Sequence, residues 1–218
     1  MRAVVFDMDG VIVDSEAQWQ EAEADFFRAT VRDWRAEHHK AIVGMGVEDV
    51  YHHLVREFDL AMGKVEFLDR ADEVARKVYL ERVECAEGFL DLARGLKHKG
   101  VLTAIASSSP SRWIKLVLDR FSLSPLLDVV VSADDVGGRT KPQPDVYLEA
   151  AARLGLPTSE CLAIEDSSIG LLAAKRAGMK CAAFRTTHNE TQDLSLADFE
   201  LSGFAGLDYD RLVARLKR

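Results

Sequence analysis

Cysteine is scarce in this sequence, which contains three of them, at Cys85, Cys161 and Cys181. They lie far apart and form no C-x-x-C pair. An odd number of widely spaced cysteines argues against both a disulfide framework and a zinc site. We therefore expect free thiols and a cytoplasmic location, where thiols stay reduced.

The sequence also lacks a long apolar run and an excess of basic residues. No run approaches the roughly 20 apolar residues of a transmembrane helix, and the N-terminus has neither the long apolar region nor the cleavage site of a secretory signal. The 28 Lys and Arg residues are outnumbered by 36 Asp and Glu and are scattered, so they form no track for a phosphate backbone. We expect neither a membrane nor a nucleic acid as partner.

Two glycine-rich nucleotide-binding motifs are absent as well. The sequence contains neither G-x-G-x-x-G nor G-x-x-x-x-G-K. These loops cradle the phosphates of dinucleotides and nucleoside triphosphates. Hydride transfer with a nicotinamide cofactor and P-loop chemistry are therefore excluded as functions.

What the sequence does have is a regular arrangement of apolar residues. With 48% hydrophobic and 29% charged residues over 218 positions, the chain can bury a full core. Short runs rich in Val, Ile and Ala predict buried strands at 3–7, 102–107, 127–132, 161–166 and 180–185. Helical patterns lie between the later strands, at 111–121, 144–155 and 168–178. This alternation predicts an α/β fold, a doubly wound, Rossmann-like parallel sheet with helices on both faces.

Residues 15–84 interrupt this alternation. They contain no strand-like run, and their first apolar residues recur at helical spacing, at Trp19, Ala22, Phe26 and Ala29. Glycine-containing breakers at 43–46 and 61–63 divide the segment into several helices. We expect a core domain built from 1–14 and 85–218, with 15–84 inserted as a helical cap domain over the sheet.

Polar residues follow the predicted strands at the points where these end. Asp7, Ser107 and the pair Glu165–Asp166 each close a strand, and Lys141 lies in a loop before a helix. In an open parallel sheet, ligands bind beyond the carboxyl ends of the strands, so these side chains are expected to meet there. Clustered carboxylates need a cation, and oxygen ligands of this kind suit Mg²⁺.

Four short motifs carry a resemblance that covers nearly the whole chain. They are "DMDGVIVDS" (7–15), "AIASSS" (104–109), "KPQPD" (141–145) and "AIEDSSIG" (163–170). In this order and at these distances they resemble the motifs of the haloacid dehalogenase superfamily, and in particular its phosphatase branch with a helical cap. That branch contains beta-phosphoglucomutase and the sugar-phosphate phosphatases.

The resemblance implies a role for each acidic residue of the motifs. Asp7 would be the nucleophile that forms an aspartyl phosphate, and Asp9 would protonate the leaving alcohol and then deprotonate the attacking water. Mg²⁺ would be held by Asp7, by the backbone carbonyl of Asp9 and by Asp166. Glu165 would stand beside or just behind the ion. Asp14 can be explained as a cap of the following helix and receives no catalytic role.

The remaining site residues would contact the phosphoryl group or the leaving group. Ser107 would donate a hydrogen bond to a phosphoryl oxygen, and Lys141 would pair with Asp7 and the phosphoryl group. Ser108 is assigned to substrate binding. From the cap we expect Trp19 and the loop at 44–49, with Gly46 and Val47, to shape the leaving group's pocket. The acidic residues of 16–25 are expected on a solvated helix face.

These assignments imply a Mg²⁺-dependent phosphomonoester hydrolase that acts on a small, sugar-like metabolite, as a monomer or weak homodimer. A phosphomutase is the first alternative, but at the positions of the cap histidine and arginine of beta-phosphoglucomutase stand Trp19 and Val47. Arg56 or Lys64 is then the substitute cation to consider. A dehalogenase is disfavoured because it lacks an acid/base at the position of Asp9. A binding protein that has kept only the fold is disfavoured by the intact catalytic set.

Overall fold

The computed structural model describes residues 1–42 and 45–217, and for residues 23, 25, 36 and 40 it describes the backbone alone. Its centre is a six-stranded sheet in the order β3-β2-β1-β4-β5-β6, in which every neighbouring pair is parallel. The strands are β1 Ala3–Phe6, β2 Leu102–Ala106, β3 Val129–Val131, β4 Cys161–Glu165, β5 Lys180–Phe184 and β6 Phe199–Leu201. The first five confirm the predicted strands, and β6 was not predicted.

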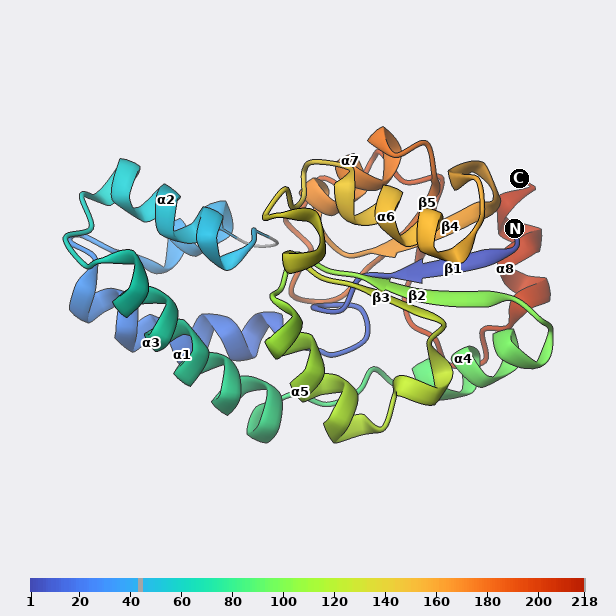
Figure 1. The fold of residues 1–218 in the computed structure, drawn as a ribbon, viewed down its shortest axis with the longest axis horizontal. Helices are drawn as coiled ribbons and strands as arrows, with labels where there is room; N and C mark the ends of the chain where they lie inside the picture. Colours follow the sequence, from blue (N-terminus) through green and yellow to red (C-terminus); the bar gives the residue numbers. More distant parts are fainter. Residues whose placement is uncertain (43–44, 218) are drawn as a thin grey trace.

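Helices cover both faces of this sheet, as the predicted doubly wound fold requires (Figure 1). On one face pack α4 (Phe89–His98), α5 (Ser111–Phe121) and α8 (Tyr209–Leu216), and on the other α6 (Asp145–Leu154) and α7 (Ser168–Arg176). Short 3₁₀ turns complete the connections, η3 (Ser124–Leu126), η4 (Asp134–Val136) and η5 (Thr158–Glu160). Each face has its own apolar cluster, because the strands are buried on both sides.

Between β1 and α4 the chain leaves the sheet and forms a helical cap at one end of the molecule (Figure 1). The cap consists of α1 (Glu16–Thr30), η1 (Ala36–Ala41), α2 (Val47–Phe58), α3 (Lys64–Lys77) and the π-helical turn η2 (Val78–Arg82). It has an apolar cluster of its own, which includes Phe27, Ile42, Leu54 and Phe67. The division into domains at 14/15 and 84/85 stays a prediction.

Two glycines begin the later cap helices. Gly46 is the N-cap of α2 and Gly63 that of α3, with backbone in the extended region. Both lie in predicted breakers, although residues 43–44 of the first breaker lie outside the described residues.

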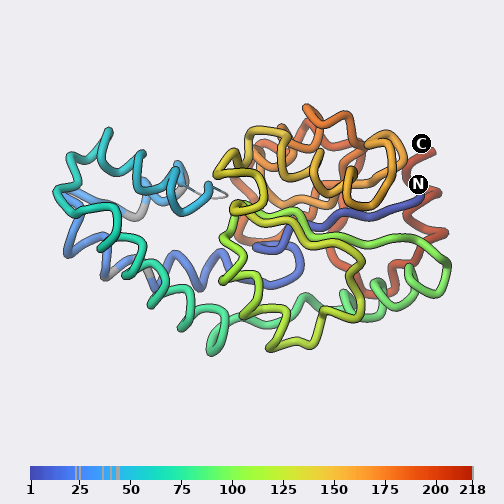
Figure 2. Tube along the Cα trace, in the orientation of Figure 1, coloured from blue at the N-terminus to red at the C-terminus, as the bar shows by residue number. Residues whose placement is uncertain are grey.

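β1 runs from the N-terminus toward the cap, and the other strands are parallel to it (Figure 1). Both termini lie at the opposite end of the sheet from the cap (Figure 2). The carboxyl ends of the strands, where side chains of several loops converge, therefore face the cap. The three cysteines are free, as predicted. No helix in the described part of the chain is long and apolar enough to cross a membrane.

Candidate active site

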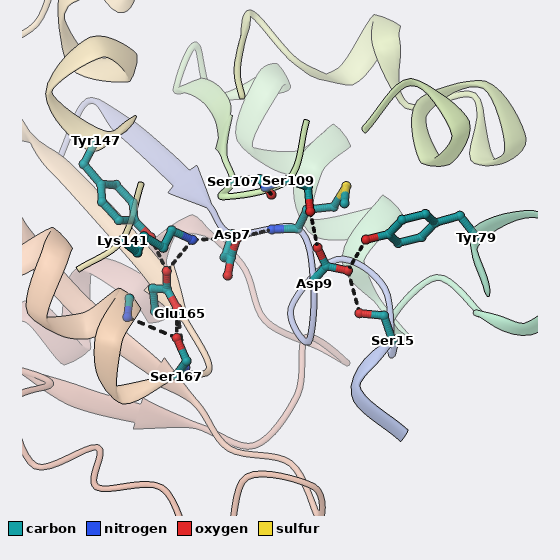
Figure 3. A network of polar contacts seen from close by, with 12 residues as sticks. Asp7, Asp9, Ser15, Tyr79, Ser107, Ser109, Lys141, Tyr147, Glu165 and Ser167 are labelled. Carbon is teal, nitrogen blue, oxygen red and sulfur yellow. Dashed lines mark hydrogen bonds and ion pairs between the residues drawn. The ribbon is translucent and has the colours of Figure 1, made fainter. Parts of the chain in front are cut away.

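Polar side chains from separate loops meet at the carboxyl edge of the sheet (Figure 3). Asp7 follows β1, Ser107 follows β2, and Asp166 follows β4. These three strands are neighbours in the sheet, which brings residues more than 150 positions apart in the sequence into one cluster. The predicted convergence is thus present in the structure.

Lys141 is the buried cation at the centre of this cluster. Its Nζ lies 2.7 Å from Asp7 Oδ1 and 2.6 Å from Glu165 Oε1, and its side chain is 1% exposed. Burial lowers the pKa of Lys141, but the charges of Asp7 and Glu165 outweigh burial and raise the pKa above its ordinary value. Lys141 therefore stays an ammonium ion. Lys141 is thus a buried ion-pair partner and not a solvated loop charge.

Glu165 is held by donors on both of its carboxylate oxygens. Tyr147 Oη donates to Oε1 at 2.6 Å, and Ser167 Oγ donates to Oε2 at 3.2 Å. A Cβ placed on Gly170, in the first turn of α7, would lie 2.1 Å from this carboxylate, so only glycine leaves room for it. Together with Lys141 these contacts hold Glu165 in a fixed position behind Asp7.

The cluster carries more negative charge than Lys141 balances. Burial and the charge of Glu165 raise the pKa of Asp7 to about 8, although Lys141 lowers it. Burial and the charges of Glu16, Glu165 and Asp7 raise the pKa of Asp166 well above its ordinary value. One carboxylate oxygen each of Asp7, Glu165 and Asp166 lies within 4.8 Å of the others. Buried oxygens at this spacing fit a divalent cation, which would remove their mutual repulsion.

A tight turn after β1 lets the backbone at Gly10 pass close to Asp166. Gly10 has φ +71°, and a Cβ on it would lie 2.0 Å from Asp166 Oδ2. The turn is closed by the Gly10 N–H, which donates to the Val13 carbonyl at 2.9 Å. Both the backbone conformation and the close approach require glycine here.

Two serines after β2 present hydroxyls beside Asp7. Ser107 Oγ accepts a hydrogen bond from the Ser109 N–H at 3.0 Å, which leaves the Ser107 hydroxyl hydrogen for a ligand. Ser108 Oγ is buried and has no hydrogen-bond partner among the described residues. Both residues line the same cavity as Asp7. A buried hydroxyl without a partner is costly, so this pair suits an anionic ligand that accepts hydrogen bonds.

Asp9 is held between the core and the two chain segments that enter and leave the cap. Ser15 Oγ and Tyr79 Oη donate to Asp9 Oδ1 at 2.7 and 2.8 Å, and Ser109 Oγ donates to Oδ2 at 3.0 Å (Figure 3). Tyr79 is fully buried in the turn η2, and Trp19 Nε1 donates to its Oη at 3.3 Å. These partners were not predicted. Tyr79 is 70 positions from Asp9, and no local pattern marks such a contact.

Two expectations about the start of α1 are wrong. Among the acidic residues of 16–25, Glu21 is 75% exposed as predicted, and the side chains of residues 23 and 25 lie outside the described part. Glu16 does not lie on a solvated helix face: it lines the cavity, where burial and the charge of Asp9 raise its pKa to about 7. Its position three residues before Trp19 places both on one helix face, and this spacing is the signal that was available. Asp14 does not cap the helix, because Ser15 is the N-cap residue. The Asp14 side chain is exposed, and its Oδ1 lies 3.8 Å from His188 Nε2.

The cap residues of the predicted pocket lie against the core. Trp19 and Val47 line the cavity, and the Trp19 ring packs on Trp113 with the centroids 5.1 Å apart. Gly46 approaches the core so closely that a Cβ would lie 3.0 Å from Thr140 Oγ1. Thr140 Oγ1 also donates to Asp49 Oδ2 at 2.9 Å, which joins α2 to the residue before Lys141. Residue 44 of the predicted loop lies outside the described residues.

The two cations considered for the cap are placed elsewhere. Arg56 is paired with Glu57 at 2.6 Å, and Lys64 with Glu48 at 2.7 Å. All four side chains are more than a third exposed, and none lines the cavity. Among the described residues that line it there is no Lys or Arg.

Comparison with known proteins agrees with this geometry. Residues 4–184 match the haloacid dehalogenase-like hydrolase family. Hexitol phosphatase B of Escherichia coli K12 is 30% identical over 94% of this chain and 93% of its own length. Protein SUPPRESSOR OF QUENCHING 1, chloroplastic, of Arabidopsis thaliana is 34% identical over 86% of this chain, which spans only 18% of that protein.

Among solved structures, CbbY of Rhodobacter sphaeroides in complex with phosphate superposes with a TM-score of 0.84 at 24% identity, and each chain is covered over 100% of its length. The likeness at this identity concerns the fold, including the inserted helical cap. The match over residues 4–184, together with the relative hexitol phosphatase B, places the chain in the haloacid dehalogenase-like hydrolase family, in the phosphatase branch that carries a helical cap.

Proposed function

We propose that this chain is a Mg²⁺-dependent phosphomonoester hydrolase that releases inorganic phosphate from a small, sugar-like phosphorylated metabolite. The observation that carries the proposal is the buried ion pair of Lys141 with Asp7, beside the free hydroxyl of Ser108. A carboxylate next to an ammonium ion and unpaired donors suits nucleophilic attack on a phosphoryl group. The relative named hexitol phosphatase B supports a phosphorylated polyol or sugar as substrate class.

The residues around Asp7 fit a magnesium ion. Asp7 and Asp166 would supply carboxylate oxygens and Asp9 its backbone carbonyl, with Glu165 behind them. Glu165 is the least available of these ligands, because its two oxygens already accept from Lys141, Tyr147 and Ser167. When bound, Mg²⁺ would offset the negative charge that Asp7 and a phosphoryl group bring together.

The protein's own side chains account for both halves of the reaction. The Met8 N–H and Lys141 both contact Asp7 Oδ1, at 2.7 Å each, so Oδ2 is the oxygen that attacks phosphorus. The Oδ2–P bond forms while the ester P–O bond breaks, and the departing alcohol takes a proton from Asp9. Water then attacks phosphorus, gives its proton to Asp9, and releases Asp7 and inorganic phosphate. Ser107, Ser108 and Lys141 would stabilise the charge on the phosphoryl oxygens.

Hydrolysis is favoured over phosphoryl transfer to a second phosphate ester. A mutase must bind a second phosphate in its cap, and the described cavity residues include no Lys or Arg for it. Trp19 and Val47 stand on the cavity wall instead, and Glu16 adds negative charge. Water is therefore the proposed acceptor from the aspartyl phosphate.

The proposal is tested by measuring phosphate release from a panel of sugar phosphates, polyol phosphates, nucleotides and 4-nitrophenyl phosphate. Turnover with Mg²⁺, its loss with EDTA and its absence in Asp7→Asn are expected. No turnover of any ester by the wild-type protein would contradict it and favour a binding protein on the same fold. With beta-glucose 1-phosphate, formation of glucose 6-phosphate without phosphate release would favour the mutase.

A further inference from the structure

The cavity that begins at Asp7 and Asp9 continues into the cap and encloses about 90 Å³. Its walls change character along this path. At the core end they carry the carboxylates and the serine hydroxyls of the candidate active site. At the cap end they are formed by apolar side chains, which include Phe26, Phe27, Ile42, Val50 and Phe67. The cavity thus reaches the apolar cluster of the cap.

All but three of the described cap residues that line the cavity are apolar, and the exceptions are Glu16, His39 and Tyr79. The Tyr79 hydroxyl is already engaged with Asp9 and Trp19. Glu16 follows directly on Ser15, which contacts Asp9, and so belongs to the catalytic end. His39 is buried, and burial lowers its pKa, so it adds no positive charge. Polar recognition is therefore concentrated near the phosphate end.

We infer that the alcohol released at this site is amphipathic: any hydroxyls lie close to the phosphorylated carbon, and an uncharged apolar ring or chain fills the cap end. The inference rests on the proposed function and narrows its substrate class. Within phosphorylated sugars and polyols, it favours those that lack hydroxyls on the far side or carry an apolar substituent there.

The physical reason is the cost of a hydroxyl without a partner. A hydroxyl moved from water into the cap end would lose its hydrogen bonds, and the apolar side chains that form most of the wall there offer no replacement. A hydrophobic pocket discriminates by about 10² against an isostere that carries one added hydroxyl. A second charged group would be rejected more strongly, since no Lys or Arg is among the described cap residues that line the cavity.

A matched pair of substrates tests this inference. Cyclohexyl phosphate and myo-inositol 1-phosphate have the same six-membered carbon ring and the same ester, and they differ in the ring hydroxyls. We expect kcat/KM for phosphate release with Mg²⁺ to be at least about tenfold higher for cyclohexyl phosphate. Hydroxyls make inositol the more acidic alcohol and the better leaving group, so this preference would have to come from the pocket.

The outcomes that contradict the inference differ from those that contradict the proposed function. Equal or faster turnover of myo-inositol 1-phosphate would overturn the inference and leave the proposed hydrolase intact. Turnover of neither ester, nor of 4-nitrophenyl phosphate, would overturn the proposed function and this inference with it. If 4-nitrophenyl phosphate were hydrolysed and neither of the two ring esters were, the proposed hydrolase would stand. The inference would be overturned, because the cap end would then not accept the apolar ring of cyclohexyl phosphate.

A pair of identical substitutions on α2 locates the effect. Val50 lines the cavity and is 8% exposed, whereas Val55 lies on the same helix and is 39% exposed. Val50→Thr should narrow the ratio of the two kcat/KM values by about threefold or more, because it adds a hydroxyl to the wall. Val55→Thr should leave the ratio unchanged. Equal effects of the two variants would overturn the inference.

A second wall position covers the case in which Val50→Thr does not fold, which thermal unfolding followed by circular dichroism would reveal. Ala71 lines the same cavity from α3 and is 7% exposed. Ala71→Ser should likewise narrow the ratio of cyclohexyl phosphate to myo-inositol 1-phosphate. A folded Ala71→Ser protein with the ratio of the wild type would count against the apolar pocket.

Discussion

At the scale of the residue, Lys141 is, within the described part of the chain, the positive charge that is buried among three carboxylates. Its contacts to Asp7 and Glu165, at 2.7 and 2.6 Å, fix both the proposed nucleophile and the group behind it. Lys141→Met keeps most of the side-chain volume but removes the charge. We expect kcat to fall by about 10²–10³ with little change in KM, the usual loss when one preorganised donor to the transition state is removed.

The control for this substitution is Lys115→Met on α5, because Lys115 is 71% exposed and pairs with Asp119 at 2.9 Å. Lys115→Met should leave kcat within experimental error of the wild-type value, since exposed ion pairs contribute little to stability. Steady-state kinetics on 4-nitrophenyl phosphate would measure both variants. A rise in KM with kcat unchanged in Lys141→Met would contradict the proposed role in the transition state.

Tyr79 contacts the proposed acid/base from the end of the cap. Tyr79→Phe removes one of the two hydrogen bonds to Asp9 Oδ1 and keeps the ring against Trp19 and Trp113. We expect kcat to fall by about tenfold, because the lost hydrogen bond helps to hold Asp9 in place. A hydrogen bond to a charged group contributes about 1.5–3 kcal/mol. The pH profile of kcat should shift as well, since Asp9 would carry the proton transfer.

The matched control is Tyr51→Phe, which removes a hydroxyl that donates to the Met62 carbonyl at 3.3 Å within the cap. Both variants lose a tyrosine hydrogen bond, but only Tyr79 contacts the site. If the two variants changed the melting temperature and kcat alike, the Tyr79 effect would be structural rather than positional.

At the scale of the element, the first turn of α7 is shaped by a carboxylate. Gly170→Ala would place a Cβ 2.1 Å from the Glu165 carboxylate, so Glu165 and its contact with Lys141 must shift. We expect lower activity and a lower melting temperature, even though alanine is intrinsically better than glycine in a helix by about 0.8–1 kcal/mol.

A glycine-to-alanine substitution in α4 should have the opposite effect on stability. Gly95 is exposed within α4, and a Cβ there meets nothing within 4 Å. Gly95→Ala should raise stability by about 0.4–1 kcal/mol and leave activity unchanged. Urea unfolding would measure the free energy of unfolding of both variants. A stabilised Gly170→Ala protein would contradict the prediction, because it would mean that Glu165 can shift at no cost in free energy.

The elements themselves show what the sequence could and could not predict. The runs around Val4 and Ile164 are continuous and apolar because these strands are buried on both faces, so they predicted β1 and β4. Strand β6 (Phe199–Leu201) escaped prediction because it has three residues and an exposed Glu200 at its centre. An edge strand this short has no periodicity to detect.

The site was predictable where function is concentrated in short motifs, and unpredictable where the cap meets the core. Asp7, Lys141 and Asp166 each end a strand or stand in a loop beside the same edge of the sheet, so topology alone brings them together. The contacts of Tyr79 with Asp9 and of Asp49 with Thr140 depend on how the cap packs on the core. No local pattern specifies that packing.

At the scale of the whole molecule, the buried carboxylates link metal binding to stability. Without a cation, the repulsion around Asp166 opposes folding, and a bound ion both removes it and adds its own binding free energy. Saturating Mg²⁺ should therefore raise the melting temperature. At 100 times the dissociation constant the gain is about 2.7 kcal/mol. For a chain of this length, each kcal/mol corresponds to about 2–4 °C.

Asp166→Asn separates the effect of charge repulsion on stability from the effect of metal binding. The amide keeps the shape of the carboxyl group without its charge, so the variant should melt about 2–4 °C higher than wild type in EDTA, for a relief of about 1 kcal/mol. It should also lose most of the Mg²⁺-dependent rise, because an amide oxygen binds the ion less strongly than a carboxylate. Differential scanning calorimetry of wild type, Asp166→Asn and the exposed control Asp193→Asn, each in EDTA and in Mg²⁺, makes the comparison. A full Mg²⁺-dependent rise in Asp166→Asn would place the ion away from this cluster. An unchanged melting temperature in EDTA would mean that the Asp166 carboxyl group does not oppose folding.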